Sequence, residues 1–86
     1  LIKQNKMSKT WKERVLNAAT KEDQIDRSTL RRRFRIPSTE MDNETFNNII
    51  GRTTRHLYAE KALKRTDRGV YEITRKGERI LAEYQA

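Results

Sequence analysis

Residues 46–74 read FNNIIGRTTRHLYAEKALKRTDRGVYEIT, and the spacing of their apolar side chains changes from that of a helix to that of a strand. The first part predicts a helix that begins between Asp42 and Glu44 and ends near Lys61. One stripe of this helix collects five apolar or small positions at helical spacing: Phe46, Ile49, Ile50, Thr53 and Leu57.

A β-hairpin and a last helix are predicted after residue 61. Residues 63–66 and 70–73 alternate as two short strands, and residues 67–69, Asp-Arg-Gly, supply the turn between them. Thr74 is a suitable cap for the last helix. The apolar stripe of that helix is formed by Ile80, Leu81 and Tyr84.

Two further helices are predicted upstream. Thr10 and Glu13 match a capping box, which begins a helix over residues 11–21. Asp26 caps a second helix over residues 27–35, and Ile25 with Leu30 has the spacing of a hydrophobic staple. Pro37 ends that helix, since the residue before a proline avoids helical dihedrals. Residues 37–40 are then a loop or a single helical turn.

The predicted fold is mainly α with a small β-hairpin. Three helices, a two-stranded wing and a C-terminal helix, in this order, are typical of a winged helix-turn-helix domain. We expect this domain to span residues 10–86, after a flexible tail over residues 1–9. Because the chain begins with Leu1 rather than Met, we also expect it to be part of a longer protein.

Positive charge is concentrated in two blocks of the chain. The 86 residues carry a net charge of +8, and basic residues dominate residues 25–36 and 51–76. Such a charge favours a polyanionic partner. The chain has no cysteine and one histidine, so no disulfide, metal site or cofactor is expected. It has neither a long apolar run nor a visible signal peptide, which predicts a cytoplasmic, nucleoid-associated protein without membrane contact.

Double-stranded DNA is the partner that this arrangement predicts. The second helix of a helix-turn-helix lies in the major groove, where Asn can pair with adenine and Arg with guanine. Either residue can equally contact phosphate, and the sequence does not decide between these roles. Gly51 reflects either close packing against another helix or a close approach of the backbone to DNA. The candidate contacts come from the second helix, the third helix and the wing: Arg31, Arg32, Arg35, Asn47, Asn48, Gly51, Arg52, Arg55, Lys64, Arg65 and Arg68.

Residues 46–57, with Phe46-Asn47-Asn48-Ile49-Ile50-Gly51, and the strand motif Arg68-Gly69-Val70-Tyr71-Glu72-Ile73-Thr74 together resemble a known family. They are similar to the N-terminal winged-helix domain of Mrr-type restriction endonucleases, over residues 46–77. The resemblance implies a DNA-recognition part of a restriction system, covalently attached to a separate nuclease domain. The nuclease motif of that family ends in Glu or Gln, one residue, then Lys. Only Gln4-Asn5-Lys6 fits it, with no carboxylate before it, so no catalytic centre and no small-molecule substrate are expected.

Two alternative functions remain open at this point. Some winged helices are protein-interaction or dimerisation modules, and the acidic residues of 37–50 are poorly suited to lie beside phosphates. Binding of RNA or single strands uses exposed aromatic rings, for which Tyr58 is the one candidate. We expect His56 to be half-buried in packing, and Trp11 and Tyr84 to belong to the core.

Overall fold

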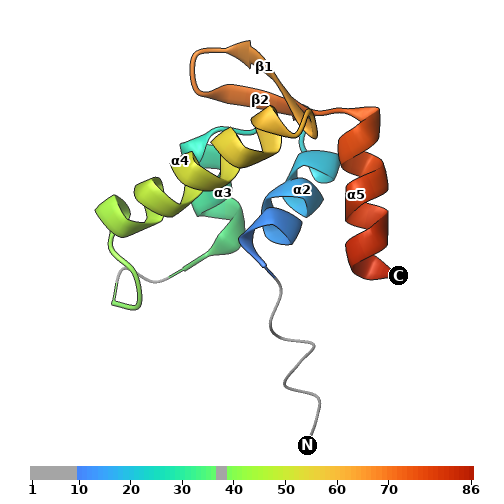
Figure 1. The fold of residues 1–86 in the computed structure, drawn as a ribbon. Helices are drawn as coiled ribbons and strands as arrows, with labels where there is room; N and C mark the ends of the chain where they lie inside the picture. The colour runs from blue at the N-terminus through green and yellow to red at the C-terminus, as the bar shows by residue number, and fades with distance from the viewer. Residues whose placement is uncertain (1–9, 37–38) are drawn as a thin grey trace, which may run out of the picture.

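The computed structural model describes residues 10–36 and 39–86, which form four helices and one two-stranded antiparallel sheet (Figure 1). This order of elements confirms the predicted mainly helical fold with a hairpin. The expected tail at residues 1–9 and Pro37 lie outside the described residues. The elements are α2 (Trp11–Lys21), α3 (Arg27–Phe34), α4 (Asn43–Ala59), β1 (Leu63–Asp67), β2 (Val70–Ile73) and α5 (Arg75–Gln85).

Each of the four helices begins at a side chain that caps it. The hydroxyl or carboxylate of the cap accepts a hydrogen bond from the backbone N–H three residues later, at 2.8–3.2 Å. Such caps satisfy amide groups that have no partner within the helix. The capping residues are Thr10, Asp26, Asp42 and Thr74. The sequence predicted three of these caps, while Asp42 was placed only near the start of its helix.

The cap of α3 makes stability depend on acid pH. The backbone N–H of Thr29 donates to the Asp26 carboxylate and holds its pKa below the usual value. Because this pKa is lower in the folded than in the unfolded protein, the ionised Asp26 stabilises the fold. The stabilisation is complete above the unfolded-state pKa of about 3.9, and it is lost as the pH falls through the folded-state pKa. Asn caps as well as Asp but does not titrate. We expect Asp26→Asn to keep the Tm at neutral pH and to reduce its fall between about pH 5 and pH 2. A Tm-against-pH curve parallel to that of the wild type would contradict this assignment.

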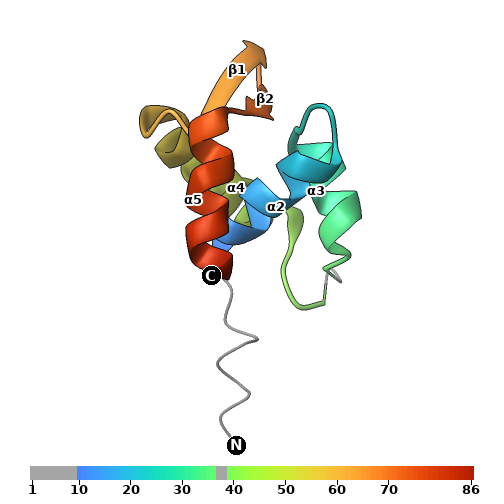
Figure 2. The same ribbon diagram turned by 90° about the vertical axis from the view of Figure 1, so that its right-hand side faces the viewer.

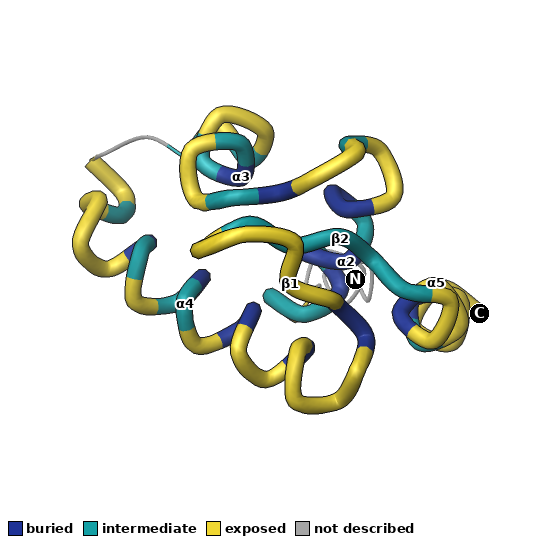
Figure 3. The backbone as a smooth tube through the Cα atoms, turned by 90° about the horizontal axis from the view of Figure 1, so that it is seen from above, coloured by how far each residue is buried: buried dark blue, intermediate teal, exposed yellow. Residues whose placement is uncertain are grey.

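The hydrophobic core lies between α2, α4 and the base of the sheet. Figure 3 shows the buried residues of α4 on the side that faces the centre of the molecule. At one end of the core the rings of Trp11, Phe34 and Phe46 pack with their centroids 6.0–6.3 Å apart. The fully buried large side chains include Leu16 and Leu63, which the apolar stripes did not predict. Trp11 is partly buried against this core, as expected.

The hairpin is joined to the segment before α3 by an isolated backbone bridge, beside which the Gln24 side chain donates to the Glu72 carboxylate at 3.3 Å. β1 and β2 pair from Leu63 with Ile73 to Asp67 with Val70, and the register is irregular between Arg65 and Asp67. Ile25 and Tyr71 exchange two backbone hydrogen bonds of 2.9 and 3.0 Å, which form an isolated antiparallel bridge. The bridge fixes the hairpin relative to the start of α3.

The third predicted helix ends two residues earlier than expected, at Ala59 rather than Lys61. Lys61 has a φ of 67°, in the left-handed region. The N–H of Ala62 donates to the carbonyl of Leu57, and the N–H of Lys61 donates to that of Tyr58. These two bonds form a Schellman motif, which is usually marked by a glycine. Because a lysine occupies that position, the sequence does not mark the end of the helix.

Two side chains that were expected to pack against the core are exposed instead. His56 is exposed rather than half-buried, because the core contact of α4 is a narrow stripe that runs through Ile50 and Leu57. Tyr84 is 41% exposed rather than part of the core, because the contact of α5 with the core ends one turn earlier at Leu81. α5 lies beside α2, on the side of α2 opposite to α4 (Figures 1 and 2). No helix within the described ranges is long and apolar enough to cross a membrane.

Candidate nucleic-acid interface

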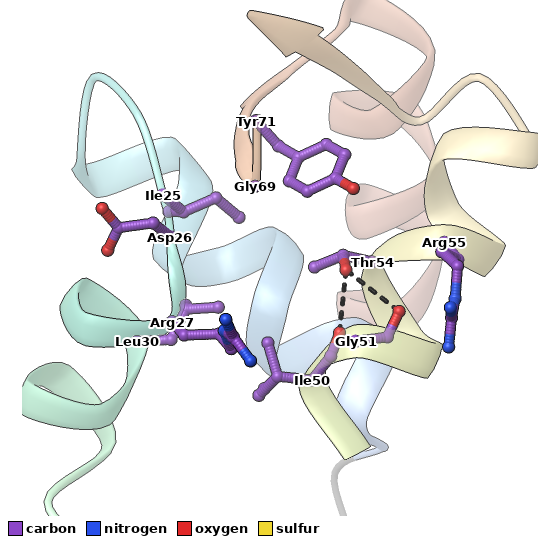
Figure 4. A pocket seen from close by; sticks show the side chains of 10 residues that line it. All are labelled: Ile25, Asp26, Arg27, Leu30, Ile50, Gly51, Thr54, Arg55, Gly69 and Tyr71. Carbon is purple, nitrogen blue, oxygen red and sulfur yellow. Dashed lines mark hydrogen bonds between the residues drawn. The ribbon is translucent and has the colours of Figure 1, made fainter. Parts of the chain in front are cut away.

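Three separate elements meet around one hollow of about 210 Å³, which we call the central slot (Figure 4). The start of α3 contributes Arg27 and Leu30, the middle of α4 contributes Gly51 and Arg55, and the hairpin turn contributes Gly69. One arginine from each basic block of the sequence, Arg27 and Arg55, therefore lines the same hollow. In Figure 3, which views this side from above, the hairpin lies between α3 and α4.

The central slot has an apolar floor and a rigid frame. Ile25, Leu30 and Ile50 line it and are almost completely buried. The ring of Tyr71 forms another wall and contacts the ring of Tyr58 edge to face, at 6.2 Å between centroids. Because Tyr71 also pairs with Ile25 through the backbone, this wall is fixed to the floor.

Gly51 leaves the mouth of the central slot open. A Cβ atom built on Gly51 would meet no other atom within 4 Å. This finding excludes close packing against another helix as the reason for the glycine, one of the two interpretations that the sequence allowed. The other interpretation, a close approach of the backbone to DNA, stays a prediction.

A second hollow, the arginine hollow, lies between the first turns of α3 and α4. Its lining comprises Arg27, Ser28, Arg31, Arg32, Asn43 and Asn47, without any carboxylate. Arg27 lines both hollows, so they adjoin along α3. Guanidinium and amide donors without competing acids are suited to anionic oxygens.

Arg31 does not lie on the outer face of α3 as predicted. Its Nη2 donates to the carbonyl of Met41 at 3.1 Å, and its guanidinium lies 4.9 Å from the ring centroid of Phe46. Its Nη1 is buried and finds no partner in the described part of the chain. The outward stripe of α3 therefore begins at Arg27, while Arg31 holds the segment before α4.

The remaining predicted contacts are spread over the surface. Asn48 and Arg52 are exposed on α4 but line neither hollow. Arg35 lies at the far end of α3, in another hollow that contains Glu22. On the hairpin, Arg68 is exposed beside Gly69, and Lys64 and Arg65 lie on β1. Lys64 pairs with Glu72 at 3.7 Å, the Nε of Arg65 donates to the carbonyl of Asp67 at 3.4 Å, and Asn47 is half-buried in the arginine hollow.

Arg27, Asn43 and Tyr71 line these hollows although the sequence did not mark them. Arg27 directly follows the cap of α3, so its place in the first turn could be predicted. Its closeness to the hairpin could not, because it depends on the one-residue bridge between Ile25 and Tyr71.

The arginines around the central slot carry uncompensated charge. The three ion pairs found within residues 10–36 and 39–86 are Lys12 with Glu60, Arg33 with Glu22, and Lys64 with Glu72. Arg27, Arg55 and Arg68 take part in none of them, and all three are exposed. Exposed guanidinium groups without ion-pair partners are suited to anions, and the one carboxylate that lines the slot with them is that of Asp26.

The described residues contain no group of three or more His, Asp or Glu side chains that could hold a metal ion. Comparison with protein families, curated proteins and solved structures finds no match for this chain. A functional conclusion therefore rests on the residues and the geometry of the face that carries the central slot.

Proposed function

We propose that the chain is a winged-helix module that binds double-stranded DNA. In this proposal α4 enters the major groove, the start of α3 lies against the sugar–phosphate backbone, and the hairpin is the wing. Each element contributes exposed cations or amides to the same face. Because of the resemblance noted in the sequence, we also propose that the module supplies recognition to a larger restriction-type protein, with any cutting done elsewhere in that protein.

One observation carries the proposal: Arg27 of α3, Arg55 of α4 and Gly69 of the hairpin turn line a single slot. These residues are far apart in the sequence, and their elements are those that a winged helix directs at a duplex. Arg55 lines the slot and Asn47 lines the adjoining arginine hollow, and in this proposal base edges are within reach of both. Arg32, Arg65 and Arg68 are exposed around them and suit phosphate contacts.

A salt titration of duplex binding tests the proposal. About five exposed arginines on this face predict a slope of log K against log salt of roughly −4.5, since each neutralised phosphate contributes about −0.9. The measurement is fluorescence anisotropy with a labelled duplex of about 20 base pairs, which spans roughly two helical turns. Absence of binding at low salt, or binding insensitive to salt, would rule the proposal out.

A further inference from the structure

The central slot combines an apolar interior with a charged rim, in which Arg27 and Arg55 outnumber the one carboxylate, Asp26. Ile25, Leu30 and Ile50 form the interior, while Arg27 and Arg55 lie at the mouth. The Thr54 hydroxyl in the wall already donates to the carbonyls of Ile50 and Gly51, at 2.8 and 3.2 Å, and so offers no hydrogen to a ligand. An apolar side chain of a partner protein would fill the interior but would leave the arginines unused. A nucleotide satisfies both parts, because the flat face of its base packs against apolar side chains and its phosphate is anionic.

The size of the slot distinguishes between two ways of using it on DNA. A duplex docked on α4 presents one apolar group in its major groove, the thymine methyl. A single water molecule, which a methyl group resembles in size, needs a cavity of only about 10–15 Å³, and on the same measure the slot has about 210 Å³. A methyl would therefore leave most of the slot empty, whereas a whole base would occupy it.

We propose that the central slot holds one nucleobase that has left the base stack, with the phosphate of that nucleotide at Arg27 and Arg55. This inference rests on the proposed DNA binding and adds a preferred substrate to it. The glycine at position 51 has a physical reason here, because any side chain there would project at the mouth through which the base enters. The interior walls are largely aliphatic, so the slot selects an unstacked base by shape and discriminates little between the four bases.

A base leaves the stack most readily where it has no pairing partner, because unpairing and unstacking then cost least. The chain should therefore prefer a duplex that contains one unpaired nucleotide over the same duplex fully paired. We expect the Kd of the duplex with the unpaired nucleotide to be about tenfold lower than that of the fully paired duplex. A modest gain in buried base surface gives a ratio of this size. The two duplexes carry nearly the same phosphate charge, so the ratio does not come from electrostatics.

The test measures this Kd ratio for three proteins by competition against a labelled duplex. The probes are a fully paired duplex, the same duplex with one unpaired dA, and free dAMP. Gly51→Leu places a side chain at the mouth of the slot and is expected to bring the ratio close to one. Ala59→Leu adds the same side chain at an exposed position of α4 outside the slot, and should keep the wild-type ratio. The methyl resonances of Ile25 and Ile50 in the wild type give a readout that needs no variant.

Each outcome decides the inference. A tenfold preference that Gly51→Leu abolishes and Ala59→Leu preserves, with both methyl groups shifted by the unpaired dA alone, supports it. Equal Kd values for the two duplexes overturn the inference and leave DNA binding intact. Failure of both duplexes to bind at low salt overturns the proposed function and the inference with it. Methyl shifts with dAMP as large as those with the unpaired dA would instead identify a site for free nucleotides.

Discussion

Replacing both Arg27 and Arg55 by alanine is expected to weaken binding of a fully paired duplex by about 100-fold at low salt. The two side chains come from different helices and both line the central slot, without ion-pair partners in the described residues. Losing a contact to DNA costs about 1–3 kcal/mol when the residue reads a base and less when it contacts phosphate. Two such losses correspond to about 2.7 kcal/mol, or two factors of ten. Anisotropy titrations of the wild type and the double variant measure the difference.

The matched control removes the same charge from α5. Arg75 and Arg79 are exposed on this helix, which lies across α2 from α4 (Figure 1). Their replacement by alanine is expected to change the Kd by no more than about threefold, because it lowers the overall electrostatic attraction between the protein and DNA. Equal weakening by the two double variants would show that net charge, and not this face, determines binding.

Gly77→Ala is expected to lower the free energy of unfolding by about 2 kcal/mol or more, the range of an overpacked core. Gly77 lies in the first turn of α5, where an added Cβ would overlap the carbonyl oxygen of Ala62 and come within 2.8 Å of Ile73 Cγ1. The carbonyl of Ala62 cannot easily move, because it accepts hydrogen bonds from the N–H and the hydroxyl of Thr74, both at 3.0 Å. For a domain of this size the Tm should fall by about 10 °C or more.

Gly51→Ala provides the opposite result at the other helical glycine. Alanine is favoured over glycine inside a helix by about 1 kcal/mol, and an added Cβ at Gly51 meets nothing. We therefore expect a Tm that is higher by about 4–8 °C. Thermal unfolding followed by circular dichroism compares the two variants directly. If both substitutions shifted the Tm in the same direction, the packing described around Gly77 or the open space at Gly51 would be wrong.

Helix caps and the spacing of apolar residues made most of the secondary structure predictable. All four caps carry a side chain that accepts from a first-turn amide, and the hairpin follows from alternation around Gly69, whose φ is 73°. The end of α4 was misplaced because the left-handed position is taken by Lys61, although the hydrogen bonds are those a glycine would mark.

The candidate site could be predicted only in part, because its geometry depends on contacts that leave no periodic signal. The bridge between Ile25 and Tyr71 involves one residue on each side, too few for a strand pattern. Arg31 was taken for a surface residue because its charge was considered without the ring of Phe46, which lies beside it in the fold. Arg27 gained its place in the site through the same bridge.

Chemical-shift mapping of backbone amides with a fully paired duplex tests the central claim most directly. The account predicts that the shifted amides cluster in the first turns of α3, in α4 from Asn47 to Arg55, and at the turn around Arg68, while residues 78–86 of α5 stay unchanged. Shifts concentrated on α5 or on the outer side of α2, or no shifts at low salt, would contradict the assignment of this face to DNA.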